Sequence, residues 1–258
     1  MTVFNKEYSR YYDLLYRDKD YAGEADFVER LIRAHHPTAT SVLELGCGTG
    51  RHAELLVHRG FKLHGVDFSE RMLHEAHARK SLLPADKASF LDFSYGDIRE
   101  VRLGVCFDTV ISLFHVMSYQ TENADLNAAF ATVRAHLAPG GIFIFDFWYG
   151  PAVLSEMPAV RIKRLNDDKI EVTRIAEPWM QPEKNCVTVN YEINIVRKKD
   201  GAFNRFNERH CMRYLFLPEI SNLFERHNMQ LVFSCEWMSG KAPGLNTWSL
   251  CTGGIVVK

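Results

Sequence analysis

Hydrophobic positions follow two different periods along the first 150 residues of the chain. Between residues 41 and 147, short apolar runs alternate with segments in which apolar residues recur every three or four positions. Runs of the first kind predict strands and segments of the second kind predict helices. We expect strands at 41–45, 61–66, 89–94, 107–113 and 142–147. Strands that alternate with helices indicate a parallel sheet with helices on its faces.

The pattern changes after Trp148. From Val187 to Ile195 every second residue is apolar, which is typical of a strand with one face in water. Lys199-Asp200-Gly201 then predicts a hairpin turn, and a helix at 218–227 precedes two closing strands at 231–237 and 249–257. We therefore expect an α/β fold with a seven-stranded mixed sheet, helices on both faces, and an antiparallel β insertion after the fifth strand.

These segments divide the chain into three parts. Residues 1–40, rich in tyrosine and then helical, are expected to form an N-terminal helical cap. Residues 41–154 and 217–258 are expected to form the sheet domain, and residues 155–216 the insertion. Because the apolar side of the strand near residue 190 must be covered, the insertion is expected to lie at an acceptor cleft or against a second subunit.

The composition and net charge of the chain limit the kinds of partner that it is expected to bind. Apolar residues make up 47% of the 258 residues, as in an ordinary globular protein. The net charge of −1 disfavours nucleic acid, because phosphate-binding proteins usually have a basic excess. No membrane-spanning run or signal peptide is expected, and the six cysteines form no Cys-x-x-Cys pair. The sequence predicts a cytoplasmic protein with reduced thiols and no metal site.

Three polar features follow three successive expected strands. They are Gly46-x-Gly48-x-Gly50, Asp67 and Asp97. Ligands of open α/β sheets bind at the carboxyl ends of the strands, where glycines let the backbone approach them closely. Asp67 is placed to accept hydrogen bonds from a ribose diol, and Asp97 from an adenine amino group. The alternative is that the glycines only form a tight turn and that the aspartates cap helices.

The chain differs from two common nucleotide-binding motifs, and these differences indicate the kind of nucleotide that it binds. A dinucleotide fingerprint requires a glycine where this chain has Arg51, and the Gly-Lys-Ser/Thr pattern of phosphate-binding loops is absent. A ligand with ribose and adenine but without pyrophosphate therefore fits better.

Residues 42–50, 65–69 and 96–98 resemble the motifs of the Rossmann-like, class I S-adenosylmethionine-dependent methyltransferases. Leu137-Ala138-Pro139-Gly140-Gly141 resembles the family's turn before the fifth strand, which we expect to end the preceding helix. The resemblance implies a Rossmann-like fold and S-adenosylmethionine as cofactor. It also implies these cofactor-binding residues: Gly46, Gly48, Asp67, Met72, Asp97, Ile98 and Leu113.

A narrower resemblance covers the flanks. Tyr12-Asp13-Leu14 and Lys19-Asp20-Tyr21, with the insertion, resemble methyltransferases that act on nucleotide-linked amino sugars. This implies that Tyr12 and Tyr21 close over the cofactor and that the acceptor is a sugar amino group. The tyrosines could equally pack on a helix. Those relatives carry a histidine where this chain has Tyr119, which leaves the base and the accepted atom open.

The segment 113–120 follows the fourth expected strand, beside the expected cofactor methyl group. Its titratable residues, His115 and Tyr119, are the candidate catalytic residues, and Asp146 is the next candidate. Alternatively, His115 could be a packing residue or a cofactor contact, Tyr119 could form a wall of the pocket, and Asp146 could cap a helix or loop. Aromatic residues on neighbouring segments are the candidate substrate-binding residues, since such rings suit a sugar, a base or a sulfonium cation. They are Trp148, Tyr149 and Trp248.

The favoured function is methyl transfer to a small molecule, with a nucleotide-linked sugar as acceptor. Methylation of another metabolite at oxygen is the main alternative. Methylation of RNA or protein would call for a basic stripe or an appended domain, and a non-catalytic binding module would call for a blocked cleft. Arg51 disfavours a dehydrogenase. The sequence is compatible with a homodimer but does not fix the oligomeric state.

Overall fold

The computed structural model describes residue 11 and residues 14–257. These residues form two compact units. The larger unit comprises Tyr21–Glu156 and the chain from Arg213 onward, and the smaller one comprises the described residues up to Asp20 together with Met157–Met212.

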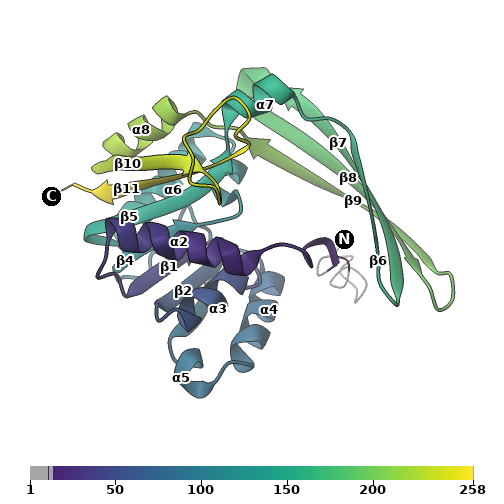
Figure 1. Ribbon diagram of the computed structural model, residues 1–258, viewed down its shortest axis with the longest axis horizontal. Helices are drawn as coiled ribbons and strands as arrows, with labels where there is room; N and C mark the ends of the chain where they lie inside the picture. Colours follow the sequence, from purple (N-terminus) through teal and green to yellow (C-terminus); the bar gives the residue numbers. More distant parts are fainter. Residues whose placement is uncertain (1–10, 12–13, 258) are drawn as a thin grey trace. The chain divides into compact units, whose positions relative to one another are not determined.

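The larger unit is built on a seven-stranded sheet of order β10-β11-β5-β4-β1-β2-β3 (Figure 1). The strands are β1 Ser41–Leu45, β2 Lys62–Asp67, β3 Leu91–Tyr95, β4 Phe107–Ser112, β5 Leu137–Trp148, β10 Met229–Glu236 and β11 Ser249–Val256. The first five run parallel, and β11 and β10 continue the sheet antiparallel. The predicted mixed sheet is confirmed.

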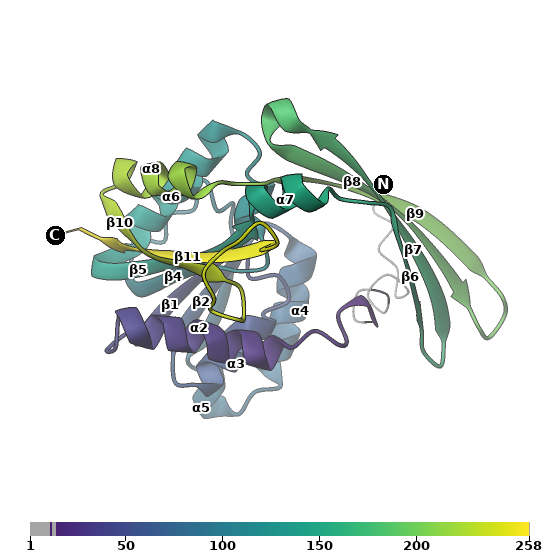
Figure 2. The ribbon, with the colours of Figure 1, turned by 45° about the horizontal axis from the view of Figure 1, so that its top comes forward.

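Helices cover both faces of this sheet. They are α2 Tyr21–His35, α3 Arg51–His58, α4 Glu70–Ser81, α5 Ala85–Ala88, α6 Asn123–His136, α7 Gly150–Glu156 and α8 Leu217–Arg226, with the 3₁₀ helix η1 Val116–Tyr119. One apolar layer joins the sheet to α2, α3 and α4, and a second joins it to α6 and α8. Figure 2 shows α6 and α8 on one side of the sheet and α2 and α3 on the other.

The end of α6 differs from the sequence prediction. Pro139-Gly140-Gly141 was expected to end this helix, but α6 ends at His136 and the proline and glycines belong to β5. The His136 ring holds the helix end, because its Nδ1 donates to the carbonyl of Thr132 and its Nε2 accepts from the amide of Leu103. Beside this start of β5, the pairing of β4 with β5 is irregular between Phe107 and Thr109.

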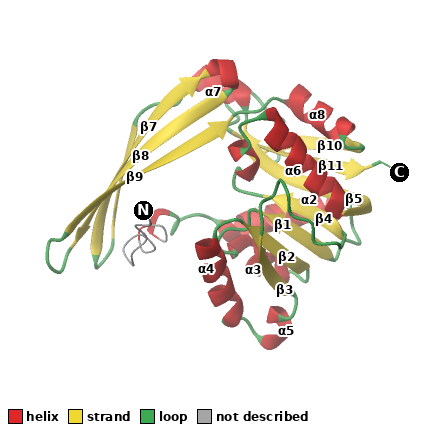
Figure 3. Ribbon diagram, turned by 180° about the vertical axis from the view of Figure 1, so that it is seen from behind, coloured by secondary structure: helices red, strands yellow, loops and turns green. Residues whose placement is uncertain are grey.

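The smaller unit contains the predicted antiparallel insertion. Its sheet has the order β6-β7-β8-β9, and β7, β8 and β9 are its long strands (Figure 3). The strands are β6 Arg161–Asn166, β7 Ile170–Gln181, β8 Cys186–Arg197 and β9 Phe203–Arg213, with a 3₁₀ helix η2 at Pro182–Lys184. The predicted turn at 199–201 joins β8 to β9.

One face of this second sheet carries an apolar cluster. Tyr11, Leu14 and Leu15 belong to the same cluster as side chains of β7 and β8, among them Ile170 and Ile193. The alternation predicted for β8 is visible only in part, since Ile193 and Ile195 are buried and Asn190 is exposed, whereas Thr188, expected on the face in water, is buried. Residues near the N-terminus therefore cover part of the insertion sheet, whereas α2 packs on the large sheet.

Candidate active site

Asp67 and the glycine loop meet at the carboxyl ends of β1 and β2. The amide of Gly48 donates to Asp67 Oδ2 (2.8 Å), and the amide of Ser69 donates to Oδ1 (2.9 Å). Burial raises the pKa of Asp67, although these amide hydrogen bonds oppose the rise. Each carboxylate oxygen can accept a second hydrogen bond, so the pair suits the two hydroxyls of a ribose.

Two glycines of the loop have different surroundings. Both have positive φ, +79° at Gly46 and +54° at Gly48. A Cβ atom at Gly46 would lie 2.6 Å from Cγ2 of Val116, so this glycine makes a close contact with the segment after β4. A Cβ atom at Gly48 would meet no atom within 4 Å. Backbone at Gly48 is therefore open to a ligand, whereas Gly46 is closed by protein.

Asp97 and Ile98, predicted to contact adenine, have distinct environments. Nε of Arg99 lies 3.0 and 3.1 Å from the two carboxylate oxygens of Asp97, and Nη1 of Arg99 contacts Asp125 at 2.9 Å. The Arg99 guanidinium lowers the pKa of Asp97. The Ile98 side chain lies in the core, and no described residue accepts a hydrogen bond from its amide. That amide is a donor suited to an adenine edge.

Met72 lies on the first turn of α4, beside Asp67. Its amide donates to Oγ of Ser69 (3.3 Å), so the predicted helix cap at Ser69 is present. The Met72 side chain is partly buried.

The segment after β4 forms a strained turn. Oγ of Ser112 donates to the carbonyl of Leu45 (2.9 Å), and Leu113 is buried. Phe114 and His115 then both have positive φ, +65° and +62°. Such a conformation is costly for residues with a side chain and is concentrated at functional sites. The turn ends with Val116, the residue that contacts Gly46.

His115 meets two residues from strands that are distant in sequence. Its Nε2 lies 3.0 Å from Oγ of Ser249 and 3.2 Å from Oδ2 of Asp146. The backbone amide of His115 also donates to Oδ1 of Asp146 (3.2 Å). Asp146 is only 1% exposed, so its carboxylate is committed to these contacts. The sequence named His115 and Asp146 as separate candidates and did not single out Ser249.

Aromatic rings line the next part of the site. The ring centroid of Trp148 is 6.4 Å from that of His115 and 6.3 Å from that of Trp248. The indole of Trp248 donates to Glu156. Tyr149 packs against the core layer of α6 and α8 instead. Tyr119 ends η1 and is 46% exposed. Of the sequence candidates, His115, Asp146, Trp148 and Trp248 therefore come together.

Tyr12 lies outside the described residues, and Tyr21 begins α2. The ring of Tyr21 lies 5.1 Å from that of His52, and the Arg51 guanidinium carbon lies 5.1 Å from the Tyr21 ring. Tyr21 therefore covers the start of α3, the helix that follows the glycine loop.

A buried acidic pair beside this helix escaped the sequence analysis. Oε2 of Glu24 lies 2.7 Å from Nε2 of His52, and Oε1 of Glu44 lies 3.8 Å from Nδ1 of the same ring. Glu44 Oε2 is buried without a hydrogen-bond partner, and burial raises the pKa of this carboxyl to about 8. A glutamate inside the apolar run 42–45 was the pattern that could have revealed it. Among the described residues no His, Cys, Asp or Glu cluster is arranged to hold a metal.

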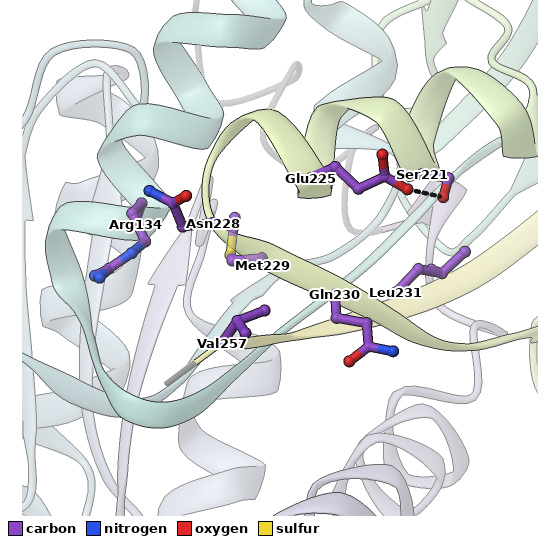
Figure 4. A pocket seen from close by; sticks show the side chains of 8 residues that line it. All are labelled: Arg134, Ser221, Glu225, Asn228, Met229, Gln230, Leu231 and Val257. Atoms are coloured by element: carbon purple, nitrogen blue, oxygen red, sulfur yellow. Dashed lines mark hydrogen bonds between the residues drawn. The ribbon is translucent and has the colours of Figure 1, made fainter.

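A cavity of about 740 Å³ lies elsewhere in the larger unit. It is lined by residues of α6, α8, β10 and the chain end, as Figure 4 shows: Arg134, Ser221, Glu225, Asn228, Met229, Gln230, Leu231 and Val257. Met229 pairs with Val256, and Ile255 pairs with Ile142 near the start of β5. The cavity therefore sits at the sheet edge opposite the carboxyl ends of the parallel strands and is separate from the candidate site.

Residues 42–141 match the profile of a family described as a methyltransferase domain. Together with the sheet order and a loop suited to adenosine, the match shows that the chain has the Rossmann-like fold of the class I S-adenosylmethionine-dependent methyltransferases and is similar to that family over residues 42–141. Among the described residues no helix is long and apolar enough to cross a membrane.

The chain is also similar to individual methyltransferases of known name. The chain is 36% identical over 156 residues to dTDP-3-amino-3,4,6-trideoxy-alpha-D-glucopyranose N,N-dimethyltransferase of Streptomyces venezuelae, which covers 60% of this chain and 62% of that protein. It is 28% identical to dTDP-3-amino-3,6-dideoxy-alpha-D-glucopyranose N,N-dimethyltransferase of Streptomyces fradiae over 93% of this chain and 89% of that protein. The crystal structure of DesVI from Streptomyces venezuelae matches with a TM-score of 0.79 and 26% identity, over 98% of this chain and all of that one.

Proposed function

We propose that this enzyme methylates the amino group of a nucleotide-linked sugar. The observation that carries the proposal is the likeness to two N,N-dimethyltransferases of dTDP-amino sugars, one of them over 93% of this chain. The pairing of His115 with a buried carboxylate beside two tryptophans adds chemical support, because an imidazole can accept a proton and aromatic faces suit a sugar ring.

S-adenosylmethionine would be held by the residues around the glycine loop. Asp67 would accept the ribose hydroxyls, the amide of Ile98 would donate to adenine, and the open backbone at Gly48 would approach the ligand. The wider set in this role is Tyr12, Tyr21, Gly46, Gly48, Asp67, Met72, Asp97, Ile98 and Leu113. Asp97 would act together with Arg99, to which it is already bound.

The bound cofactor supplies an electrophilic methyl group on a sulfonium. The remaining work falls to the protein, which must orient the acceptor nitrogen, remove water and accept a proton. Trp148 and Trp248 would pack against the sugar, with Tyr149 behind them. His115 and Tyr119 would face the amino group, and His115 contacts the carboxylate of Asp146.

The test is labelled methyl transfer followed by mass spectrometry, with matched pairs of acceptors. Each pair consists of a dTDP-linked 3-amino sugar and the same sugar with a 3-hydroxyl group. We expect the label on the nitrogen of the amino sugar and none on its hydroxyl counterpart. Equal transfer to both members would favour O-methylation, and transfer to neither would reject sugars as acceptors.

We further infer that the acceptor is a small molecule and that the enzyme works in the cytoplasm. The net charge of −1 supports the first statement. The second is supported by six free cysteines, four of them buried as thiols. The homodimer stays a prediction, which analytical ultracentrifugation would test.

A further inference from the structure

His115 lies in the strained turn after β4 and is held there by residues of other strands. Two consecutive residues, Phe114 and His115, have positive φ. This conformation is strained for a residue with a side chain and persists only where the surrounding structure enforces it. Asp146 is part of that enforcement, because its Oδ1 accepts the amide hydrogen of His115 itself. One buried carboxylate therefore fixes both the backbone and the ring of the same residue.

The contacts of the His115 ring favour one of its two neutral tautomers. A carboxylate can only accept, and Oδ2 of Asp146 lies 3.2 Å from Nε2 of His115. A negative oxygen at this distance attracts a hydrogen on Nε2 and repels a lone pair there, so the contact favours the Nε2–H form. Oγ of Ser249, 3.0 Å from Nε2, can then accept from the ring. It lies 3.5 Å from Oδ2 of Asp146, toward which its own hydrogen can point.

The second ring nitrogen of His115, Nδ1, is available to accept a proton. No described residue forms a hydrogen bond with Nδ1 of His115. The arrangement differs from a hydrolase triad, in which serine and aspartate bind opposite nitrogens of the ring. Here both oxygens meet the same nitrogen. Ser249 is therefore no nucleophile activated by the ring, and both groups act as anchors.

We propose that Asp146 and Ser249 are positioning residues that hold His115 with hydrogen on Nε2, so that Nδ1 is the atom that takes the proton of the acceptor. The step is a simple proton transfer. The N–H bond of the acceptor ammonium breaks, an Nδ1–H bond forms, and the electron pair stays on the acceptor nitrogen. The positive charge moves to the imidazole, where Asp146 neutralises it, and water later removes the proton.

The acceptor in this proposal rests on the proposed function. The first test needs no acceptor, because it measures the tautomer of His115 in the free protein. Long-range ¹H–¹⁵N spectra of the ¹⁵N-histidine-labelled protein report which ring nitrogen is protonated. At a pH of about 9, where an unperturbed imidazole is neutral, we expect His115 in the Nε2–H form. The H115Q variant assigns its signals among the eleven histidines. An Nδ1–H form in the wild-type protein would overturn the proposal.

The second test uses Asp146→Asn, which preserves shape but removes the charge. An asparagine can turn its NH₂ group toward Nε2, so we expect a shift of His115 toward the Nδ1–H form. The matched control is Asp92→Asn on β3, whose carboxylate contacts Lys80 far from the site. We expect the control to leave the His115 signals and turnover unchanged. An unaltered His115 tautomer in folded D146N would refute the role of Asp146.

Kinetics then connect the tautomer to the reaction. With a dTDP-linked amino sugar we expect D146N and H115Q to lose about 10²–10⁴-fold in turnover, as when a general base is lost, with cofactor affinity within a few-fold. Wild-type turnover in D146N would reject the proton transfer. If the wild-type enzyme methylates no amino sugar, the proposed function fails, while the spectra of the free protein still decide the tautomer.

Discussion

Replacing Gly46 with alanine should destabilise the enzyme through backbone strain and through a close contact with Val116. Gly46 has φ +79°, where an alanine costs roughly 1–2 kcal/mol. The new Cβ would also lie 2.6 and 2.7 Å from the two γ-carbons of Val116, so Val116 and its turn must move. Forcing an extra methyl into a packed site costs about 1–3 kcal/mol. The expected loss of unfolding free energy is therefore about 2–5 kcal/mol.

Gly104→Ala is the matched control for this prediction. Gly104 has φ +72°, and a Cβ atom there would meet nothing within 4 Å, so only the backbone strain applies. Urea unfolding of both variants separates the two contributions, and we expect Gly46→Ala to lose about 1–3 kcal/mol more than Gly104→Ala. Calorimetry should also show weaker S-adenosylmethionine binding only for Gly46→Ala. Equal losses of stability in the two variants would refute the contact with Val116.

Three further changes test the site and its surroundings. Asp67→Ala should weaken S-adenosylmethionine binding by about 1.5–3 kcal/mol in calorimetry, and an unchanged affinity would exclude the ribose contact. Ser69→Ala should lower the unfolding free energy by about 0.5–2 kcal/mol, because it removes the cap of α4; an unchanged denaturation midpoint would contradict this. Burial raises the pKa of Glu44 from 4.5 to about 8, so the folded state keeps a proton that the unfolded chain loses. Stability should therefore fall as the pH rises between these values, and Glu44→Gln should flatten that part of the profile; an equally steep fall in the variant would reject the assignment.

The fold was predictable because its strands have distinct patterns. The core strands are apolar runs that end in glycine or aspartate, and β8 alternates as a strand with one covered face does. The start of β5 was missed, because a proline and two glycines usually interrupt an element. Here the hydrogen bonds of His136 end the helix first, and the strand begins at Leu137.

The site was predictable only in its local parts. Asp67 and Gly48 belong to short motifs at the ends of neighbouring strands, and the amide of Gly48 donates a hydrogen bond to Asp67. The group around His115 joins residues 31 and 134 positions apart, and no spacing rule links them. The burial of Glu44 and its nearness to His52 likewise depend on packing between α3 and β1. Such groups depend on tertiary packing, so periodicity and short motifs could not reveal them.

The contact between Gly46 and Val116 connects the glycine loop to the strained turn. Val116 follows His115 directly, so the loop expected to hold the cofactor packs against the turn that presents the expected base. From the other side, Asp146 on β5 holds the same turn through the amide of His115. Neither anchor alone explains two consecutive residues with positive φ, but both together can offset their strain. Because packed groups move together, a ligand that orders the glycine loop should also order His115. Cofactor binding would thus prepare the base before the acceptor arrives.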